Sequence, residues 1–263
     1  MKQLIEKDIR GGVARLILNR PEVHNALNTE MIEQLTYALD ECTSDPNIRV
    51  VVLGAQGKSF CAGADISMMK EMGAATPKQN RAEAEKLGHL MHTLYHMTKP
   101  TLAMVSGSVY GGGLGLVCSV DIAIASDTAV FSVSDVKLGL IPAVISPYVV
   151  ASMGPRAARR YFLTGERFGA VEAHRLGLVH EVVQPAEVEP MADHMIRALL
   201  DAGPQAQVKV KQLVRDVMMR PIDASLQEMT TEAIAACRAS KEAAEGLSAF
   251  LEKRLPSWRD QNL

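Results

Sequence analysis

The stretch Gly111-Gly112-Gly113-Leu114-Gly115-Leu116 decides how this chain is interpreted. It follows an apolar segment, 101–106, that is typical of a buried strand, and it opens a segment with the composition of a helix. A helix N-terminus presents unpaired backbone N–H groups, and glycines allow another group close to that backbone. The stretch therefore predicts a place where a negatively charged oxygen is bound or formed. The alternative is a tight strand-to-helix turn that only packs on its neighbours.

A second loop of the same character lies upstream. The run 50–54, Val-Val-Val-Leu-Gly, predicts a buried strand, and the loop after it has small residues at positions 61–64. Small side chains leave room for a ligand beside the backbone. Two loops that each offer one N–H predict a two-donor site of the kind that stabilises a developing oxyanion.

Composition places the chain among ordinary globular proteins. It has 263 residues, of which 48% are hydrophobic and 22% charged, and its formal net charge is −2. That charge gives no general attraction to nucleic acid or to an acidic membrane. The four cysteines lack C-x-x-C spacing, so neither a zinc nor a redox site is predicted. Without a signal sequence or a membrane-length apolar run, a cytoplasmic protein with reduced thiols is expected.

Periodicity and breaker residues predict an α/β protein. The expected strands are 5–9 and 13–18, paired as a hairpin around Gly11-Gly12, followed by 50–54, 101–106, 121–126 and 129–133. The expected helices are one that Asn28-Thr29 caps, 66–75, which Thr76-Pro77 ends, 81–97, and then 188–201, 204–219, 222–240 and 241–253.

The chain resembles the crotonase family, the enoyl-CoA hydratase/isomerase superfamily, in seven short motifs from about residue 4 to about residue 257. These are Asn19-Arg20-Pro21, Asn25-Ala26-Leu27, Phe60-Cys61-Ala62-Gly63-Ala64-Asp65-Ile66, Gly111-Gly112-Gly113, Asp121-Ile122-Ala123-Ile124-Ala125, Leu138-Gly139-Leu140-Ile141-Pro142 and Leu163-Thr164-Gly165-Glu166. The resemblance implies a β-β-α spiral core over residues 1–195 and a helical region over residues 196–263. That region would form homotrimers, which pair into homohexamers. It implies no metal and no redox cofactor.

The resemblance also implies a substrate, an acyl-CoA thioester, whose carbonyl oxygen accepts hydrogen bonds from the N–H groups of Ala64 and Gly112. The other implied substrate and CoA contacts are Glu22, Val23, His24, Ala62, Asp65, Ile66, Tyr110, Gly111, Ser134, Lys137 and Leu140, with Phe250 and Lys253 from a neighbouring subunit. Three of these have plain alternatives. Tyr110 could simply pack, Lys137 could be a surface lysine, and Lys253 could be an exposed cation at a helix end.

The chain departs from the family at the catalytic acids. Well-studied hydratases carry two glutamates, and the first of them corresponds to Gly115, which has no side chain. The second corresponds to Asp135, whose carboxylate is one methylene shorter. We expect Asp135 to be buried beside Val133, Val136 and Leu140, which would raise its pKa toward a useful value for acid–base catalysis.

Three functions follow from a single carboxylate. The first prediction is an enoyl-CoA hydratase that adds water across the α,β double bond. The segment 138–161 resembles the bacterial branch that hydrates branched glutaconyl thioesters, either 3-methylglutaconyl-CoA in leucine breakdown or relatives in terpene breakdown. Lys137 is then a candidate counter-ion for a second substrate carboxylate. The alternatives are a Δ3-Δ2-enoyl-CoA isomerase and an acyl-CoA-binding protein with little catalytic activity.

His92 and His96 have metal-ligand spacing but no partner in the sequence, so surface positions are expected.

Overall fold

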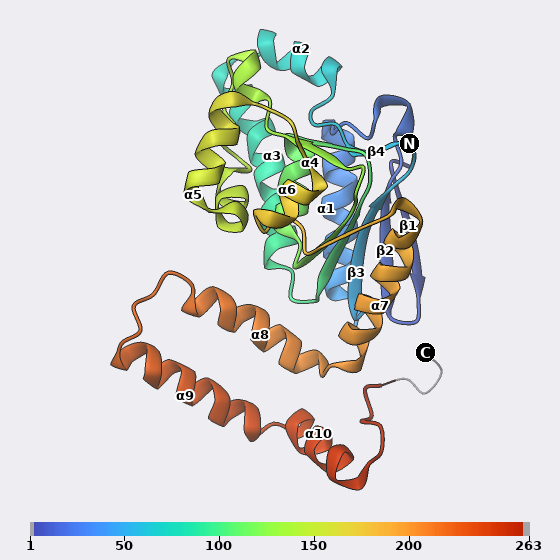
Figure 1. Ribbon diagram of the computed structural model, residues 1–263, viewed down its shortest axis with the longest axis vertical. Coiled ribbons are helices and arrows are strands. Elements are labelled where there is room, and N and C mark those ends of the chain that lie inside the picture. The colour runs from blue at the N-terminus through green and yellow to red at the C-terminus, as the bar shows by residue number, and fades with distance from the viewer. Residues whose placement is uncertain (1–2, 260–263) are drawn as a thin grey trace.

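The computed structural model of the protein describes residues 3–259 and contains two sheets (Figure 1). The strands are β1 (Ile5–Arg10), β2 (Val13–Leu18), β3 (Val50–Ala55), β4 (Ser59–Cys61), β5 (Thr101–Val105), β6 (Ser108–Tyr110), β7 (Ile122–Ser126), β8 (Val130–Ser132), β9 (Phe168–Gly169) and β10 (Glu181–Val183). The larger sheet has the order β1-β2-β3-β5-β7-β10, and the smaller has the order β4-β6-β8-β9.

From β3 to β8, consecutive strands alternate between the two sheets. β3, β5 and β7 lie side by side in the larger sheet, and the strand that follows each of them, β4, β6 or β8, lies in the smaller one. A helix follows each such pair of strands. This repeat is the β-β-α spiral that the family resemblance implies, so the expected α/β fold is confirmed.

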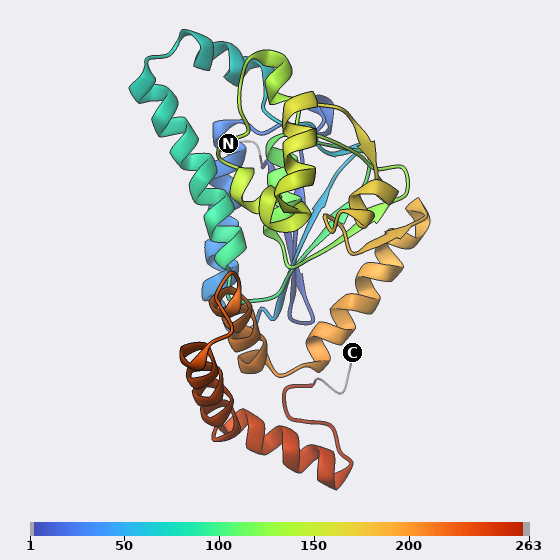
Figure 2. The ribbon, with the colours of Figure 1, turned by 60° about the vertical axis from the view of Figure 1, so that its left-hand side comes forward.

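The helices cover both faces of the larger sheet (Figure 2). They are α1 (Thr29–Ser44), α2 (Ile66–Ala74), α3 (Pro77–His96), α4 (Gly112–Ser119), α5 (Ser146–Thr164), α6 (Ala170–Arg175), α7 (Val188–Asp201), α8 (Pro204–Val217), α9 (Ala224–Arg238) and α10 (Lys241–Glu252). Successive side chains of β3 point to opposite faces. Val51 and Leu53 therefore join the main core with α1, α3 and α4, while Val50 and Val52 pack beneath α7.

One expected boundary is wrong. The expected helix 66–75 does end before Thr76-Pro77, since α2 stops at Ala74, but the same two residues also begin α3, four residues before the expected start at Arg81. The Thr76 side chain accepts a hydrogen bond from the N–H of Gln79, and the Gln79 side chain accepts one from the N–H of Thr76. This reciprocal pair of hydrogen bonds is a capping box. Proline is favourable at the first helical position because its missing N–H would have no acceptor there in any case. The hairpin of β1 and β2 is confirmed.

The helices α8, α9 and α10 extend away from the sheets as an arm (Figure 1). Polar contacts fix its base. The Glu242 carboxylate accepts hydrogen bonds from the N–H groups of Gln205 and Ala206 at the start of α8, at 2.8 and 2.7 Å. Arg49, just before β3, donates to the carbonyls of Ala202 and Trp258. The predicted boundary between residues 195 and 196 lies within α7, whose apolar side stays on the sheet as far as Leu200.

Apolar side chains of the arm face solvent, and few of them are buried in this single chain. Ile222, between α8 and α9, is 98% exposed, and Phe250 on α10 is 80% exposed. Leu247 and Leu251 continue the Phe250 surface along α10. Over residues 3–259, every helix is too short or too polar to span a membrane.

Candidate active site

Three short parallel strands bring the predicted reactive groups to one edge of the smaller sheet. β6 lies between β4 and β8, and it runs parallel to both. Ala64 follows the end of β4, Gly112 follows the end of β6, and Asp135 follows the end of β8. The carboxyl ends of parallel strands meet at one edge of a sheet, which is where open α/β sheets bind ligands. The fold therefore gathers residues that are 71 positions apart in the sequence (64 to 135).

The two glycine-containing loops touch each other. The N–H of Gly111 donates to the carbonyl of Ser132 at 3.1 Å, which ties the start of α4 to β8. A Cβ atom at Gly111 would lie 3.7 Å from the Cα of Gly63. Gly111 and Gly63 have φ values of 48° and 99°, which favour glycine. The close approach of these two loops depends on both glycines.

Two backbone N–H groups at this contact are left without an acceptor among residues 3–259. Leu27 bridges the first loop by donating to the carbonyl of Gly63 at 2.7 Å and accepting from the N–H of Asp65 at 2.8 Å. The N–H of Ala64, between these two bonds, takes no part. Gly112 is the first residue of α4, so its N–H has no partner within the helix.

A buried polar network holds the first loop in place. The Asn25 side chain donates to the carbonyls of Gln56 and Ser59 at 2.8 and 2.7 Å. Arg20 donates to Asp65 at 2.9 Å, and Asp65 in turn caps α2 by accepting from the N–H of Ser67 at 2.8 Å. Burial alone would raise the pKa of the Asp65 carboxyl, but these hydrogen bonds outweigh it and lower the pKa below its ordinary value. The Asp65 N–H donates to Leu27 and its carbonyl accepts from the N–H of Met69 at 2.9 Å, so the side chain and the backbone of Asp65 are both engaged in holding the loop.

Replacing Arg20 by methionine is expected to destabilise the protein by about 3 kcal/mol, because it leaves the Asp65 carboxylate without its cation. The two side chains are only 13% and 11% exposed. Since the folded-state pKa of Asp65 is lowered, its contribution exists above the unfolded pKa of about 3.9 and is lost as pH falls through the folded pKa. The loss should therefore shrink at low pH. Denaturant unfolding at pH 7 and below pH 4 measures it.

Arg160→Met is the matched control. Arg160 pairs with Glu166 at 2.7 Å, but these side chains are 60% and 38% exposed. Solvent screening limits such a pair to less than about 1 kcal/mol. Equal losses for the two variants would contradict the structural role of Arg20.

Asp135 begins a short 3-10 turn, Asp135–Leu138, immediately beyond β8. Desolvation raises the pKa of its carboxyl above the ordinary value, while a hydrogen bond from its own backbone N–H lowers it by less. The expected surroundings are partly wrong. Val133 is buried, but Val136 and Leu140 are 38% and 51% exposed because the turn directs them outward. The carboxyl is thus half-buried.

The position of the absent first acid is filled by apolar groups. Gly115 lies one turn after Gly112 on the same face of α4. A Cβ atom at Gly115 would lie 2.4 Å from Cγ2 of Ile145 and 3.1 Å from Cε of Met91. Both of these side chains are buried. No local pattern indicated this contact, because only the fold brings α3 and the start of α5 against α4.

The remaining predicted residues lie in three places. Glu22, Val23 and His24 form an exposed turn beside the first loop, where the carbonyl of His24 accepts from the N–H of Ala62 at 3.0 Å. Ala64 and Ile66 are exposed at the edge of that loop, and Ala62 is half-buried. Tyr110 and Ser134 are half-buried, and the Arg167 guanidinium lies 5.5 Å from the Tyr110 ring centroid.

Lys137 lies along the end of α5. A Cβ atom at Gly165, which caps that helix, would be 3.0 Å from Cε of Lys137. A cation near a helix C-terminus is favourable, which is the surface role weighed for this lysine. Phe250 and Lys253 lie at the far end of the molecule from α2 (Figure 1), so contact with CoA would require the site of another subunit.

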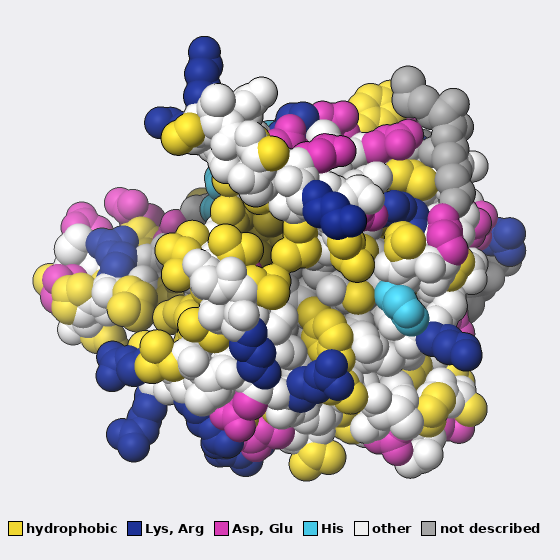
Figure 3. Space-filling model, turned by 90° about the horizontal axis from the view of Figure 1, so that it is seen from above, with side chains coloured by type: hydrophobic (Ala, Val, Ile, Leu, Met, Phe, Trp, Pro, Cys, Tyr) yellow, Lys and Arg dark blue, Asp and Glu magenta, His cyan; other side chains and the backbone are white. Residues whose placement is uncertain are grey.

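The end of the molecule that carries α2 is hollowed. Figure 3 shows hydrophobic side chains gathered around this hollow, with Lys and Arg side chains near its rim. The thiol of Cys61 lies beneath the first loop, and burial raises its pKa to about 12, so it stays protonated at neutral pH. His92 and His96 are stacked on the surface of α3, as expected. The described residues include no group of three His, Cys, Asp or Glu side chains arranged to hold a metal.

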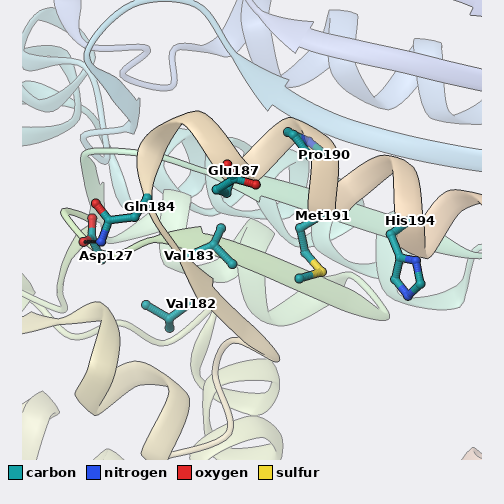
Figure 4. A pocket seen from close by; sticks show the side chains of 8 residues that line it. All are labelled: Asp127, Val182, Val183, Gln184, Glu187, Pro190, Met191 and His194. Atoms are coloured by element: carbon teal, nitrogen blue, oxygen red, sulfur yellow. Dashed lines mark hydrogen bonds between the residues drawn. The ribbon is translucent and has the colours of Figure 1, made fainter.

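Two further clefts lie elsewhere and contain none of the predicted residues. One of about 530 Å³ lies between β10 and α7 (Figure 4), and its lining residues are Asp127, Val182, Val183, Gln184, Glu187, Pro190, Met191 and His194. The other, of about 580 Å³, lies between α5 and α6 and includes Arg156 and Arg160.

The chain is similar to known proteins in both sequence and fold. The family model for enoyl-CoA hydratase/isomerase matches residues 8–261. An enoyl-CoA hydratase structure from Shewanella pealeana is 43% identical and has a TM-score of 0.94, with 97% of this chain and 96% of that chain covered. The short-chain-enoyl-CoA hydratase of Clostridium acetobutylicum is 34% identical over 257 residues, or 95% of each chain. The crotonyl-CoA hydratase of Syntrophomonas wolfei is 32% identical over 253 residues, again 95% of each. The chain belongs to the enoyl-CoA hydratase/isomerase family.

Proposed function

We propose that this enzyme adds water across the α,β double bond of an enoyl-CoA thioester. The observation that carries the proposal is the pair of N–H groups, Ala64 and Gly112, that have no acceptor within residues 3–259 and lie at the sheet edge that also carries Asp135. A thioester carbonyl bound between two such donors gains negative charge when its enolate forms. The donors then stabilise the enolate more than the ground state, which lowers the barrier.

Asp135 supplies the proton transfers. Its carboxylate takes a proton from water as the water oxygen bonds to Cβ, and the electron pair of the double bond moves toward the carbonyl oxygen between Ala64 and Gly112. The carboxylic acid then returns one proton to Cα, which regenerates the thioester. Half-burial raises the pKa of Asp135 toward the working pH and so favours both halves of this exchange. CoA would lie along the turn at Glu22 to His24 and the loop at Ala62 to Ile66.

The proposed acyl group is branched and of the 3-methylglutaconyl type. The support is the resemblance of segment 138–161 to that branch and the presence of Lys137 on the turn that carries Asp135. Among the described residues, Lys137 has no ion-pair partner, so its ammonium group is available to a second carboxylate. Its methylene groups pack along Gly165 at the end of α5, and the residue as a whole is exposed.

An isomerase is the second candidate, and one observation favours it. Ile145 and Met91 close the space beside Gly115, so a second acid is absent there. Moving a double bond between the β,γ and α,β positions requires one carboxylate and an enolate site, both of which are proposed here.

Oxygen-18 water separates these functions. The enzyme is incubated with crotonyl-CoA, with 3-methylglutaconyl-CoA and with a 3-enoyl-CoA, and the thioesters are analysed by mass spectrometry. Label in a hydroxyacyl product supports hydration, and the faster substrate identifies the acyl class. Conversion of the 3-enoyl-CoA without label would replace the hydratase by the isomerase. Thioester binding without any turnover would leave only an acyl-CoA-binding protein.

We also propose a homotrimer or a pair of trimers assembled through the arm. Ile222→Asp is expected to shift the sedimentation of the protein toward the monomer, because the apolar side chain at 222 is 98% exposed in one chain. Tyr37→Asp, on the exposed side of α1, is the control and should leave the mass unchanged. A wild-type protein that sediments as a monomer at micromolar concentration would refute the assembly.

A further inference from the structure

Ile145 fills the space beside Gly115, one helical turn from Gly112. Gly115 lacks the Cβ atom that every other residue type carries, and Cγ2 of Ile145 enters that space to within 2.4 Å of where the Cβ would stand. Cβ of Ile145 and Cε of Met91 each lie 3.1 Å from the same point. Contacts under 3.0 Å are not tolerated by real Cβ atoms, so any side chain at 115 must displace Ile145. The side chain of Ile145 therefore fits here because residue 115 is a glycine, and residue 115 can carry a side chain only if Ile145 moves or is made smaller.

The position of Ile145 is fixed by the segment that also carries Asp135. The carbonyl of Asp135 accepts from the N–H of Leu140 at 3.0 Å, which closes the turn at the start of this segment. At the other end, Ile145 precedes the first residue of α5, and its carbonyl accepts from the N–H of Val149 at 3.1 Å. These hydrogen bonds hold the backbone of Ile145, and its side chain is buried, only 3% exposed, against Gly115.

We infer that Ile145 is a specificity-determining residue that restricts proton transfer to Asp135 by keeping a second polar group, and the water it would bind, out of the site. The inference rests on the proposed function. An apolar wall of Ile145 and Met91 offers no hydrogen bond to water, so water can be held only from the Asp135 side. Truncating the wall creates space for a second carboxylate beside Gly112, and that carboxylate can share the water with Asp135.

The first test needs no substrate. Gly115→Ala in the wild-type background is expected to lower the melting temperature because the new Cβ overlaps Cγ2 of Ile145. In the Ile145→Ala background, which removes Cγ2, the same substitution should cause at most half that drop. Equal drops in the two backgrounds would overturn the reciprocal fit, whatever reaction the enzyme performs.

The second test measures hydration of crotonyl-CoA by three variants. Gly115→Glu with Ile145→Ala is expected to hydrate at least tenfold faster than Ile145→Ala alone, and its pH–rate profile should gain a second ionisation. Gly115→Gln with Ile145→Ala is the matched control, with the same volume and no acid, and should show neither gain. Equal rates for the Glu and Gln variants would overturn the inference. If the wild type hydrates no enoyl-CoA while the melting temperatures behave as stated, the proposed function fails and the packing relation survives.

Discussion

Asp135→Asn is expected to lower turnover of the preferred enoyl-CoA by about 10²- to 10⁴-fold, with little change in KM. Asparagine keeps the size and the polarity of the side chain but can neither take a proton from water nor return one to Cα. Steady-state hydration, followed by loss of the enoyl thioester absorbance, measures the effect. Full activity in this variant would remove Asp135 from both the hydratase and the isomerase mechanisms.

The same variant should not lose stability. Desolvation raises the folded-state pKa of Asp135, so the folded protein holds this proton more tightly than the unfolded chain does. The charged carboxylate therefore reduces stability as pH rises from the unfolded pKa of about 3.9 through the folded pKa. At pH 7, Asp135→Asn is expected to melt at the wild-type temperature or higher, and the difference should vanish below pH 4. Asp40→Asn, on an exposed position of α1, is the activity control with the same chemical change and is expected to hydrate crotonyl-CoA at the wild-type rate.

Replacing the Ala64 N–H by an ester oxygen is expected to lower turnover by about 10²- to 10³-fold. Incorporation of lactic acid at position 64 makes this change and keeps the methyl side chain. The N–H of Ala64 has no acceptor among residues 3–259, so the ester removes no hydrogen bond at that atom, and the melting temperature should fall only slightly, through the weaker ester carbonyl of Gly63 that accepts from Leu27. Turnover falls because the ester removes a hydrogen-bond donor that binds the enolate oxygen more strongly than the thioester carbonyl.

The matched control is the same ester at Ala62. The N–H of Ala62 donates to the carbonyl of His24 at 3.0 Å, so its removal takes away a structural hydrogen bond two residues from the site. This ester is expected to lower the melting temperature more than the ester at 64, and turnover less. The reverse order would contradict the assignment of Ala64 as a donor to the substrate.

The sequence alone predicts the elements of this fold well where one physical signal dominates. The uninterrupted apolar run at 50–54 could only be a buried strand, and Gly11-Gly12 could turn a hairpin at positive φ. The start of α3 was misjudged because Thr76-Pro77 has two interpretations. Proline ends a helix that precedes it and begins one that follows it, and only the reciprocal contact with Gln79 decides between them.

The candidate site, like the fold, could be predicted from the sequence only in part. The small residues at 61–64 and 111–113 indicate loops that a ligand can approach, and the structure places those loops in contact. The supports of the site could not be foreseen. Arg20 is 45 residues from Asp65 and Ile145 is 30 residues from Gly115, so their contacts depend on how the strands alternate between two sheets. Residues that touch only in the folded chain leave no local pattern.

The polar contacts of Glu242 and Arg49 at the base of the arm affect how subunits would associate. Glu242 joins α10 to the start of α8, and Arg49 joins the segment at Trp258 to the main body, while the apolar surface farther along the arm is left bare. The direction of the arm is therefore set before any neighbour arrives. A preorganised surface loses less conformational entropy on docking than one that must fold against its partner. We therefore expect subunit association through the arm to resemble the docking of two rigid bodies. Its rate should rise with protein concentration, and no slow ordering of the arm should limit it.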